Sequence, residues 1–577
     1  KGEKISYLSE GRDMWVIGEL GVLYAGAVNV PLSIKLGETN DLVFRVKHSD
    51  SKYVITSKFQ LAKIRAVLPE CPMVEKVILF DKIDDMKENE IYIGDIIEMG
   101  DKFLAEHEDL FIQRYKSIGP DDYANISYTS GTTADPKGIL LTHRNYTANV
   151  EQAHSVIGVT PEDRMLIILP LDHCFAHVAG FYTMMSYGAS LGMVPSGKSG
   201  KEALRNISPS IQELKPSVML SVPTLAKSFK KNIETTIAKK GKTIEKLYNF
   251  AVKNAIAYNK EGYNKGTQFV DIFRKPLMLL FDKLIFKAVR QGLGGNMKFF
   301  VGGGALLDID LQRYYYAIGI PMYQGYGLSE ATPIISANSP ARHIFGSSGK
   351  IVQPMEIKIL DADGIEQPFG SKGEICIKGE NVMAGYWKNP KSTADTIVDG
   401  WLHTGDMGYM RDAEMLYVVG RFKSLLIAAD GEKYSPEGIE ENLVESSKYI
   451  DGALLHNSQD PYTIALITPN KEALKAYAKE LGLDPETKEA KVKMLELLQD
   501  EVNMYRKGGR NFGAFPERWL PAAVCVLPEP WTEQNHFLNS SMKVVRGRVE
   551  EAYKANMEYA YTPEGKNIVN DINLASL

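Results

Sequence analysis

A loop that combines hydroxyls, glycines and one lysine is the strongest chemical signal in the sequence. Its residues are Tyr128, Thr129, Ser130, Gly131, Thr132, Thr133, Ala134, Asp135, Pro136, Lys137 and Gly138. Close backbone N–H groups, O–H donors and a cation are the groups that bind a polyphosphate. A polar hairpin turn is the alternative, but a turn does not require this run of hydroxyls followed by Pro-Lys-Gly. We therefore predict a phosphate-binding loop.

This loop differs from the P-loop of nucleotide triphosphatases. Pro136 stands where the second glycine of that motif belongs, and Gly138 stands where Ser or Thr belongs. The flanking residues 126–128 and 139–142 both have strand patterns, so we expect the loop to join two strands and not to enter a helix. These differences exclude the class of P-loop enzymes.

A second segment places a tyrosine between two glycines, shortly before a carboxylate, in the run YQGYGLSE. Gly325 and Gly327 would let the backbone approach a flat ring, on which Tyr326 could stack. Glu330 could hold a divalent cation on the phosphates. Because Glu330 occupies the position of a third glycine, this segment is not a dinucleotide-binding fingerprint. A plain strand-to-helix turn is the alternative.

Weaker signals come from two further groups. Gly303, Gly304 and Ala305 follow a predicted strand that ends at residue 301, a place that also suits a tight turn. Asp406 could accept hydrogen bonds from a ribose diol, and Arg421 could complete such a sugar clamp. Taken singly, each of these groups is typical of a surface turn.

The elements that must position these residues alternate between helix and strand. A helical pattern covers 12–27, and short apolar runs at 54–56, 76–80, 124–128, 164–169, 217–222 and 297–301 suit buried parallel strands. After about residue 348, short strands separated by Gly and Asp turns indicate antiparallel β structure. From 435 helix and strand mix again. The pattern predicts the α/β class, with layered sheets and helices, a β-rich end and a boundary near 421.

Composition excludes several classes of protein. The 577 residues hold 67 Lys and Arg against 72 Asp and Glu, a balance that does not favour a nucleic-acid partner. The four cysteines are too scattered for a disulfide scaffold or a metal knuckle. The stretch 173–197 has no charged residue, and we expect a buried helix from about 176 and a buried strand at 189–194, with a membrane span as the alternative. We expect the charged stretch 485–510 to be a solvated surface insertion.

In this order and spacing, the motifs resemble those of the adenylate-forming ligase superfamily. The resemblance covers nearly the whole chain, from the run LGVLYAGAVNVPL through YGLSE, TGD and GR. It is greatest for long-chain fatty acid–CoA ligases, because of the helical stretch between 223 and 299, the run GRFKSLLIAADGEKYSPEGIE and Lys423. Ala134 replaces a usual glycine and Ser424 replaces a usual acidic residue. Compared with the family pattern, we expect a leading segment to be missing from this sequence.

The resemblance implies ATP-dependent activation of a fatty acid to an acyl-adenylate, followed by transfer to coenzyme A. It places Mg²⁺ on Glu330 and Thr132, and the catalytic lysine at Lys543. It places His173 on the acyl–thiol side of the site, with a hydrogen-bonded core histidine as the alternative. The remaining nucleotide-site residues it implies are Thr129, Ser130, Gly131, Thr133 and Lys137 for phosphate, Gly303, Gly304, Ala305, Gly325, Tyr326 and Gly327 for adenine, Asp406 and Arg421 for ribose, and Lys423 at the hinge.

The family also implies two domains, a large AMP-binding domain at 1–421 and a small mobile α+β domain at 422–577. An inactive scaffold protein and a ligase for another carboxylate are the alternatives. We expect a cytoplasmic protein, with peripheral contact at the inner membrane face through 269–293, where apolar and basic residues interleave and Pro276 suits a helix start. A helix whose apolar face packs on the core is the alternative there.

Overall fold

The computed structural model describes residues 1–36, 39–128, 136–196, 200–262, 265–421, 425–430, 432–532, 534–538 and 544–577. The described residues form two compact units. The first contains those of 1–128, 136–404 and 408–418, and the second contains 405–407 and those of 419–577. Each unit is described by itself.

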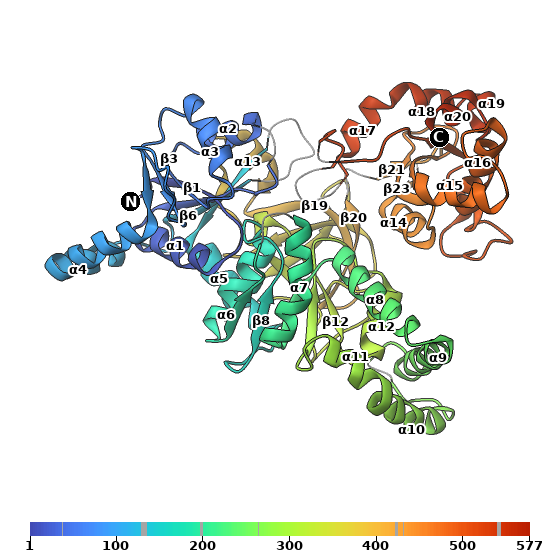
Figure 1. Ribbon diagram of the computed structural model, residues 1–577, viewed down its shortest axis with the longest axis horizontal. Helices are drawn as coiled ribbons and strands as arrows, with labels where there is room; N and C mark the ends of the chain where they lie inside the picture. The colour runs from blue at the N-terminus through green and yellow to red at the C-terminus, as the bar shows by residue number, and fades with distance from the viewer. Residues whose placement is uncertain are drawn as a thin grey trace. The chain divides into compact units, whose positions relative to one another are not determined.

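One sheet of the first unit joins the N-terminal strands to the hairpin that flanks the predicted phosphate loop (Figure 1). Its strands, in spatial order, are β17 (Gly385–Tyr386), β7 (Gly138–Thr142), β6 (Tyr123–Tyr128), β2 (Val28–Pro31), β1 (Lys4–Leu8), β3 (Ser51–Thr56), β4 (Lys76–Leu79) and β5 (Glu90–Tyr92). The strands from β6 to β5 pair in parallel, and β7 pairs antiparallel with β6. The predicted loop therefore does join two strands, and not a strand to a helix.

The second sheet changes from parallel to antiparallel along its width. Its order is β15 (Glu356–Leu360), β16 (Gly373–Lys378), β19 (Trp401–Met410), β20 (Met415–Arg421), β14 (Gly349–Ile351), β13 (Ile334–Ala337), β12 (Met322–Gly327), β11 (Phe299–Gly302), β10 (Val218–Ser221), β8 (Arg164–Ile167) and β9 (Ser190–Met193), with β18 (Ile397–Val398) beside β19. Strands β12, β11, β10, β8 and β9 are parallel, and β13 and β14 begin the antiparallel part. The predicted α/β class with a β-rich end is confirmed.

Helices cover these sheets. In the first unit they are α1 (Asp13–Tyr24), α2 (Thr39–His48), α3 (Leu61–Val67), η1 (Leu68–Glu70), α4 (Ile93–Lys116), α5 (His143–Ala153), η2 (Phe175–Tyr182), α6 (Thr183–Ser186), α7 (Gly200–Leu214), α8 (Pro223–Ala238), α9 (Lys242–Asn259), α10 (Asp271–Phe281), η3 (Asp282–Phe286), α11 (Lys287–Gly292), α12 (Ile309–Ala317), η4 (Ser329–Ala331) and α13 (Pro390–Thr396). The predicted helix start at Pro276 is wrong, because α10 begins at Asp271, whose carboxylate accepts from the backbone N–H of Gln268 at 2.8 Å.

The uncharged stretch after residue 173 folds partly as predicted. The π-helix η2 is buried throughout most of its length, with Ala176, Val178 and Phe181 in the core. Strand β9 is not buried as expected, since Ser190 is exposed and the rest of the strand is half-buried. The reason is its position at the edge of the sheet, beyond β8. Among the described residues, no helix is both long enough and apolar enough to cross a membrane.

The second unit is built around its own small sheet. Strands β23 (Ile450–His456), β24 (Ile464–Pro469) and β25 (Ala523–Val526) pair side by side, and β21 (Leu426–Ile427) pairs with β22 (Lys433–Tyr434). The helices are α14 (Glu437–Ser446), α15 (Lys471–Glu480), α16 (Lys488–Asn503), η6 (Glu517–Trp519), α17 (Arg546–Ala552), α18 (Lys554–Ala560), α19 (Pro563–Lys566) and α20 (Asp571–Ser576). The expected solvated insertion at 485–510 is wrong, because α16 buries Met494, Leu495 and Leu498 in the core of this unit.

Candidate functional site

Two of the predicted glycine segments lie at the carboxyl ends of neighbouring parallel strands. Gly303, Gly304 and Ala305 directly follow β11, and Gly325 to Gly327 end β12, which pairs with β11 in parallel. Gly303 is buried, whereas Gly304 and Ala305 are exposed. In open α/β sheets, ligands bind outside the carboxyl ends of the strands. The structure thus brings both segments to the sheet edge at which a flat ligand is expected.

Gln324 ties these two segments together. Its side chain is buried, and its Oε1 accepts from the backbone N–H of Leu307 at 2.9 Å. Its Nε2 donates to the carbonyl oxygen of Ala305 at 3.2 Å and to that of Gly325 at 2.8 Å. Sequence reasoning missed this residue, because an isolated glutamine inside an apolar strand carries no distinctive spacing.

The glycines here also have a packing role. A Cβ built on Gly327 would lie 2.0 Å from the carbonyl oxygen of Pro333, where β12 turns into its antiparallel partner β13. A Cβ on Gly303 would lie 2.9 Å from the ring of Phe175. Gly304 has φ +83°, a conformation that other residues rarely adopt. Close backbone approach is therefore built into this edge whether or not a ligand is bound.

Glu330, Tyr386 and Lys137 meet from three separate segments of the first unit. The Tyr386 hydroxyl donates to Glu330 Oε1 at 2.9 Å, and the Lys137 Nζ lies 4.7 Å from the centre of the Tyr386 ring. The backbone N–H of Met383 also donates to the Glu330 carbonyl oxygen at 2.9 Å. The result is a carboxylate at the hydroxyl and an ammonium group over the ring of one tyrosine, groups that suit a divalent cation and a phosphate. Tyr386 was not predicted as a site residue.

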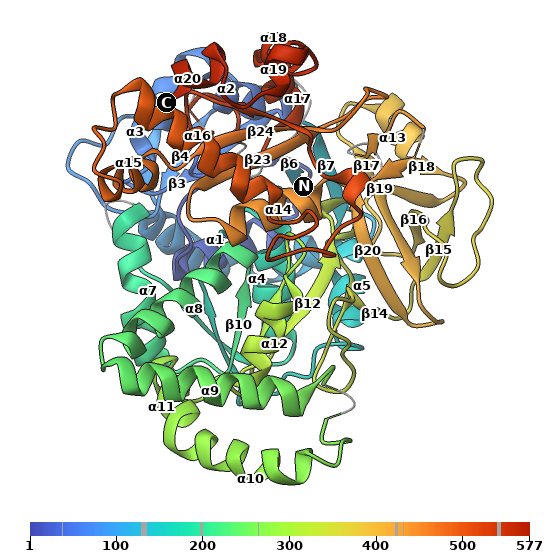
Figure 2. The same ribbon diagram turned by 90° about the vertical axis from the view of Figure 1, so that its right-hand side faces the viewer.

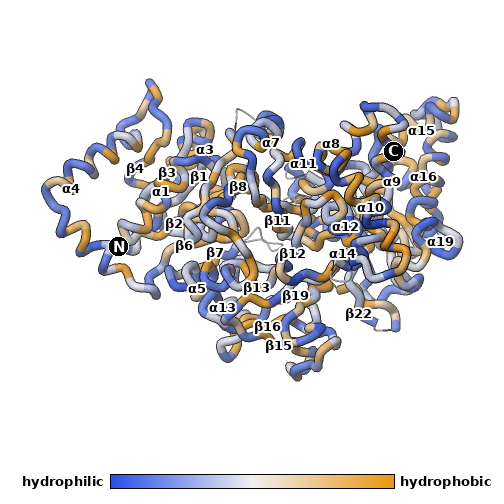
Figure 3. Tube along the Cα trace, turned by 90° about the horizontal axis from the view of Figure 1, so that it is seen from below, coloured by the Kyte–Doolittle hydropathy of each residue, from blue (hydrophilic) through white to orange (hydrophobic). Residues whose placement is uncertain are grey.

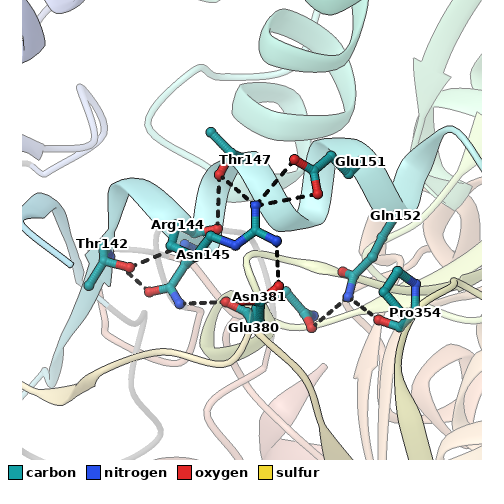
Figure 4. A network of polar contacts seen from close by, with 9 residues as sticks. All are labelled: Thr142, Arg144, Asn145, Thr147, Glu151, Gln152, Pro354, Glu380 and Asn381. Carbon is teal, nitrogen blue, oxygen red and sulfur yellow. Dashed lines mark hydrogen bonds and ion pairs between the residues drawn. The ribbon is translucent and has the colours of Figure 1, made fainter. Parts of the chain in front are cut away.

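A polar network fixes the segment that carries Tyr386 against the hairpin that carries Lys137 (Figure 4). Thr142, at the end of β7, caps α5 in a reciprocal capping box with Asn145. The Asn145 Nδ2 donates to the carbonyl oxygens of Glu380 and Val382, each at 2.8 Å. Arg144 adds an ion pair with the Glu380 carboxylate. One end of this network lies close in sequence to Lys137 and the other end lies close to Tyr386. The network therefore fixes the distance between these two site residues.

Asp406 and Arg421, which were predicted to bind a ribose, form an ion pair in the second unit. The Arg421 Nε lies 3.3 Å from Asp406 Oδ1, and Asp406 is almost fully buried while Arg421 is largely exposed. Burial raises the pKa of the nearby Glu437, with further contributions from Glu440 and Asp406. A buried carboxylate beside an exposed guanidinium offers both the acceptor and the donors that a diol could use.

His173 is exposed, so the alternative of a hydrogen-bonded core histidine is wrong for this residue. The core histidine on this segment is His177, whose Nε2 lies 2.7 Å from Glu19 Oε1 in a fully buried pair. The Tyr182 hydroxyl donates to the same carboxylate oxygen at 2.9 Å.

Several predicted residues lie outside the described part of the chain, so the structure does not place them. They are Thr129, Ser130, Gly131, Thr132, Thr133, Ala134, Lys423, Ser424 and Lys543. Their roles remain predictions from the sequence.

The two sheets and the helices that cover them define a protein of the α/β class, and the glycine segments, Glu330 and Lys137 belong to its first unit. Residues 1–387 match the model of the AMP-binding enzyme family, and this chain belongs to that family. It is 29% identical over 580 residues to long-chain-fatty-acid–CoA ligase 5 of Rattus norvegicus, covering 96% of this chain and 80% of the relative. A chloroplastic long-chain-fatty-acid–[acyl-carrier-protein] ligase of Arabidopsis thaliana is 25% identical over 604 residues, covering 97% of this chain and 79% of the relative.

A solved structure supports the fold. An anthranilate CoA ligase in complex with anthranoyl-AMP superimposes with a TM-score of 0.66 at 19% identity, covering 96% of this chain and 88% of that one. The family match and the sequence relatives, together with this shared fold, confirm the predicted resemblance to the superfamily.

Proposed function

We propose that the protein is an AMP-forming long-chain fatty acid–CoA ligase. In this proposal the fatty acid carboxylate attacks the α-phosphate of ATP and releases pyrophosphate. The thiol of coenzyme A then attacks the acyl carbon and releases AMP. The observation that carries the proposal is the meeting of Glu330, Tyr386 and Lys137 beside the glycine-rich ends of β11 and β12.

The first step brings two anions together, so it needs positive charge that is already in place. Lys137 would bind phosphate oxygens, and Lys543 would neutralise charge at the carboxylate and the α-phosphate. Glu330 and Thr132 would hold Mg²⁺, and a carboxylate oxygen is the hard ligand that Mg²⁺ prefers. When bound, Mg²⁺ would offset the charge that develops on the phosphates.

The remaining roles follow the site geometry and the family pattern. Tyr326 and residues 303–305 would hold adenine, and Asp406 with Arg421 would hold the ribose. Residues 1–421 would form the AMP-binding domain, and 422–577 would form a domain that turns about Lys423 between the two half-reactions. Exposed His173 would face the acyl and thiol groups.

A fatty-acid panel tests this function. We expect AMP release that depends on both carboxylate and coenzyme A, without ADP. Each buried CH₂ contributes about 0.8 kcal/mol, or roughly fourfold in specificity, so kcat/KM should rise with chain length while the acyl site has room. Preference for acetate would overturn the long-chain substrate, and no turnover would favour an inactive scaffold protein.

A separate experiment tests whether the acyl group is transferred to coenzyme A or to a carrier protein, because one relative is named a ligase for acyl-carrier protein. Equal amounts of coenzyme A and phosphopantetheinylated carrier protein are supplied with the same fatty acid. Acyl-CoA as the main product supports the proposal, and acyl-carrier protein as the main product overturns the acceptor while leaving adenylation intact.

We also propose that the enzyme works in the cytoplasm with peripheral contact at the inner membrane face through 269–293. Long-chain fatty acids partition into lipid, so contact there would bring the enzyme to its substrate.

A further inference from the structure

Helix α10 and the short π-helix η3 expose large apolar side chains to solvent. The exposed fraction is 67% for Phe273, 50% for Leu280 and 63% for Leu284, and Phe269, just before the helix, is 79% exposed. Figures 1 and 2 both place α10 at the outer edge of the first unit, beyond α9. Soluble proteins rarely leave such a cluster uncovered unless it contacts a partner or a membrane.

The inward face of the same segment is already packed. Phe281 and Phe286 are buried in the core, and Met278 packs against that core. Packing on the protein therefore explains one face of α10 and leaves the other unexplained. The open face carries large apolar side chains together with Lys275, whereas an ordinary surface helix presents mainly polar residues to solvent.

Helix α9 extends the exposed apolar area. Phe250 is 53% exposed, and its ring meets the Phe281 ring edge-on with centroids 5.8 Å apart. Ile244 and Leu247 on the same helix are also exposed, while Tyr248 is buried against the core. Figure 3 shows hydrophobic residues interrupted by hydrophilic ones along both helices. We call the exposed apolar residues of α9, α10 and η3, with Phe269, the α9–α10 surface.

The charge around this surface is positive. Residues 265–293 contain six basic and two acidic residues, an excess of four positive charges. Both acids are neutralised within the protein. Asp271 pairs with Lys260 and Arg274, and Asp282 pairs with Arg290 at 2.6 Å.

Three lysines remain available beside the apolar residues. Lys275, Lys283 and Lys287 are exposed, and within the described part of the chain none of them forms an ion pair. An apolar area flanked by unpaired lysines fits an interface whose interior is apolar and whose surface is anionic. A lipid bilayer that contains anionic headgroups has this structure.

We propose that the α9–α10 surface docks on an anionic lipid membrane. Phe269, Phe273, Leu280 and Leu284 enter the boundary between headgroups and acyl chains, and the three lysines bind anionic headgroups. The purpose of docking rests on the proposed function, because docking would bring the enzyme to long-chain acids dissolved in lipid. The surface itself extends the proposed contact from 269–293 to α9 and assigns the residues that make it.

Vesicle co-sedimentation of the full chain, without ATP or fatty acid, tests the docking. The vesicles contain phosphatidylglycerol and phosphatidylcholine in equal parts, or phosphatidylcholine alone. We expect wild type to sediment with the anionic vesicles and to dissociate as salt is raised. Each lysine near an anionic surface contributes about fivefold in affinity, so Lys275→Glu, Lys283→Glu and Lys287→Glu together should weaken binding by about a hundredfold or more.

A second variant removes the apolar contacts and keeps the charge. Phe273→Ser, Leu280→Ser and Leu284→Ser replace exposed residues, so the fold should persist, and vesicle binding should fall at least tenfold. The matched control for the serine variant is Ile365→Ser with Phe369→Ser, which changes two similarly exposed apolar residues on the β15–β16 connection. The matched control for the lysine variant is Lys479→Glu, Lys488→Glu and Lys507→Glu, which changes exposed lysines of the second unit. Both controls should bind like wild type.

The outcomes separate docking from catalysis. Vesicle binding that is absent in wild type, or equal in all variants, overturns the docking even if fatty acids are activated. Concentration-dependent dimers that the serine variant abolishes, without vesicle binding, would assign the surface to a second copy of the chain and also overturn it. Normal vesicle binding with no AMP formed from any fatty acid would instead overturn the proposed function and leave the docking in place. Both variants should retain wild-type activity on octanoate in the absence of vesicles.

Discussion

Replacing Tyr386 by Phe removes the hydroxyl that orients Glu330 and leaves the ring beside Lys137. The O–H···O distance of 2.9 Å and the near-complete burial of Tyr386 indicate a well-formed hydrogen bond to a carboxylate. Hydrogen bonds to charged groups contribute about 1.5–3 kcal/mol. We expect about 1.5 kcal/mol here, because Glu330 is only half-buried. If Glu330 holds Mg²⁺, the Mg²⁺ concentration for half-maximal rate should rise about tenfold.

The assay is pyrophosphate release at saturating ATP and fatty acid, over a range of Mg²⁺ concentrations. At saturating Mg²⁺ the variant should regain most of the wild-type rate, since the cation then orders the carboxylate itself. Tyr409→Phe is the matched control, because Tyr409 stacks on Tyr417 at 4.9 Å and lies half-buried in the same unit. An unchanged Mg²⁺ requirement in Tyr386→Phe, with a lower maximal rate, would show that the hydroxyl does not act through a metal ligand.

Three further predictions concern other parts of the chain. Lys543→Ala should raise the activation free energy of adenylate formation by several kcal/mol, as loss of an oxyanion donor does. Thioester formation from supplied acyl-adenylate should survive. An equal loss of rate in both half-reactions would contradict the role of Lys543. Lys423→Pro should preserve adenylation and lower thioester formation, because Pro fixes φ at a hinge, and full overall turnover would place the hinge elsewhere. Glu90→Gln should lower the free energy of unfolding by about 2 kcal/mol at neutral pH. Hydrogen bonds from Arg65 hold the pKa of Glu90 below its usual range, so this stability is present above about pH 4.3 and is lost as pH falls through the folded pKa. Urea unfolding at several pH values checks it. Asp85→Asn, at an exposed partner of the same arginine, should change little, and a similar loss in both variants would contradict the argument.

Several of the parallel strands were predictable because they are short apolar runs. Strands β3, β4, β6 and β10 fall on predicted runs, and the central residues of β6 and β10 are buried on both faces, so no amphipathic period is needed to find them. The glycine segments at 303–305 and 325–327 were predictable for a related reason. A backbone that must approach another group closely needs a residue without a Cβ, and that need is visible in the sequence.

Tyr386 and Gln324 could not be found in this way. Tyr386 acts on Glu330, which lies far away in the sequence, and the contact exists only because β17 pairs with β7. Gln324 joins two strand ends through hydrogen bonds that depend on the register of β11 and β12. Residues that position other residues depend on pairings between distant segments, and a single sequence does not specify those pairings.

Segment composition is also a poor guide to burial, because burial depends on the neighbours of an element. The charged helix α16 buries Leu495 and Leu498 in the core of the second unit, which its composition does not reveal. The uncharged strand β9 is only half-buried, because it forms the edge of its sheet beside β8. Helix α10 differs from both. Large apolar residues lie on its covered face and also on its open face, where they are interleaved with exposed lysines such as Lys275. The interleaving is already visible in the sequence around Phe273 and Leu280, but which of these residues are covered depends on the neighbours of the helix.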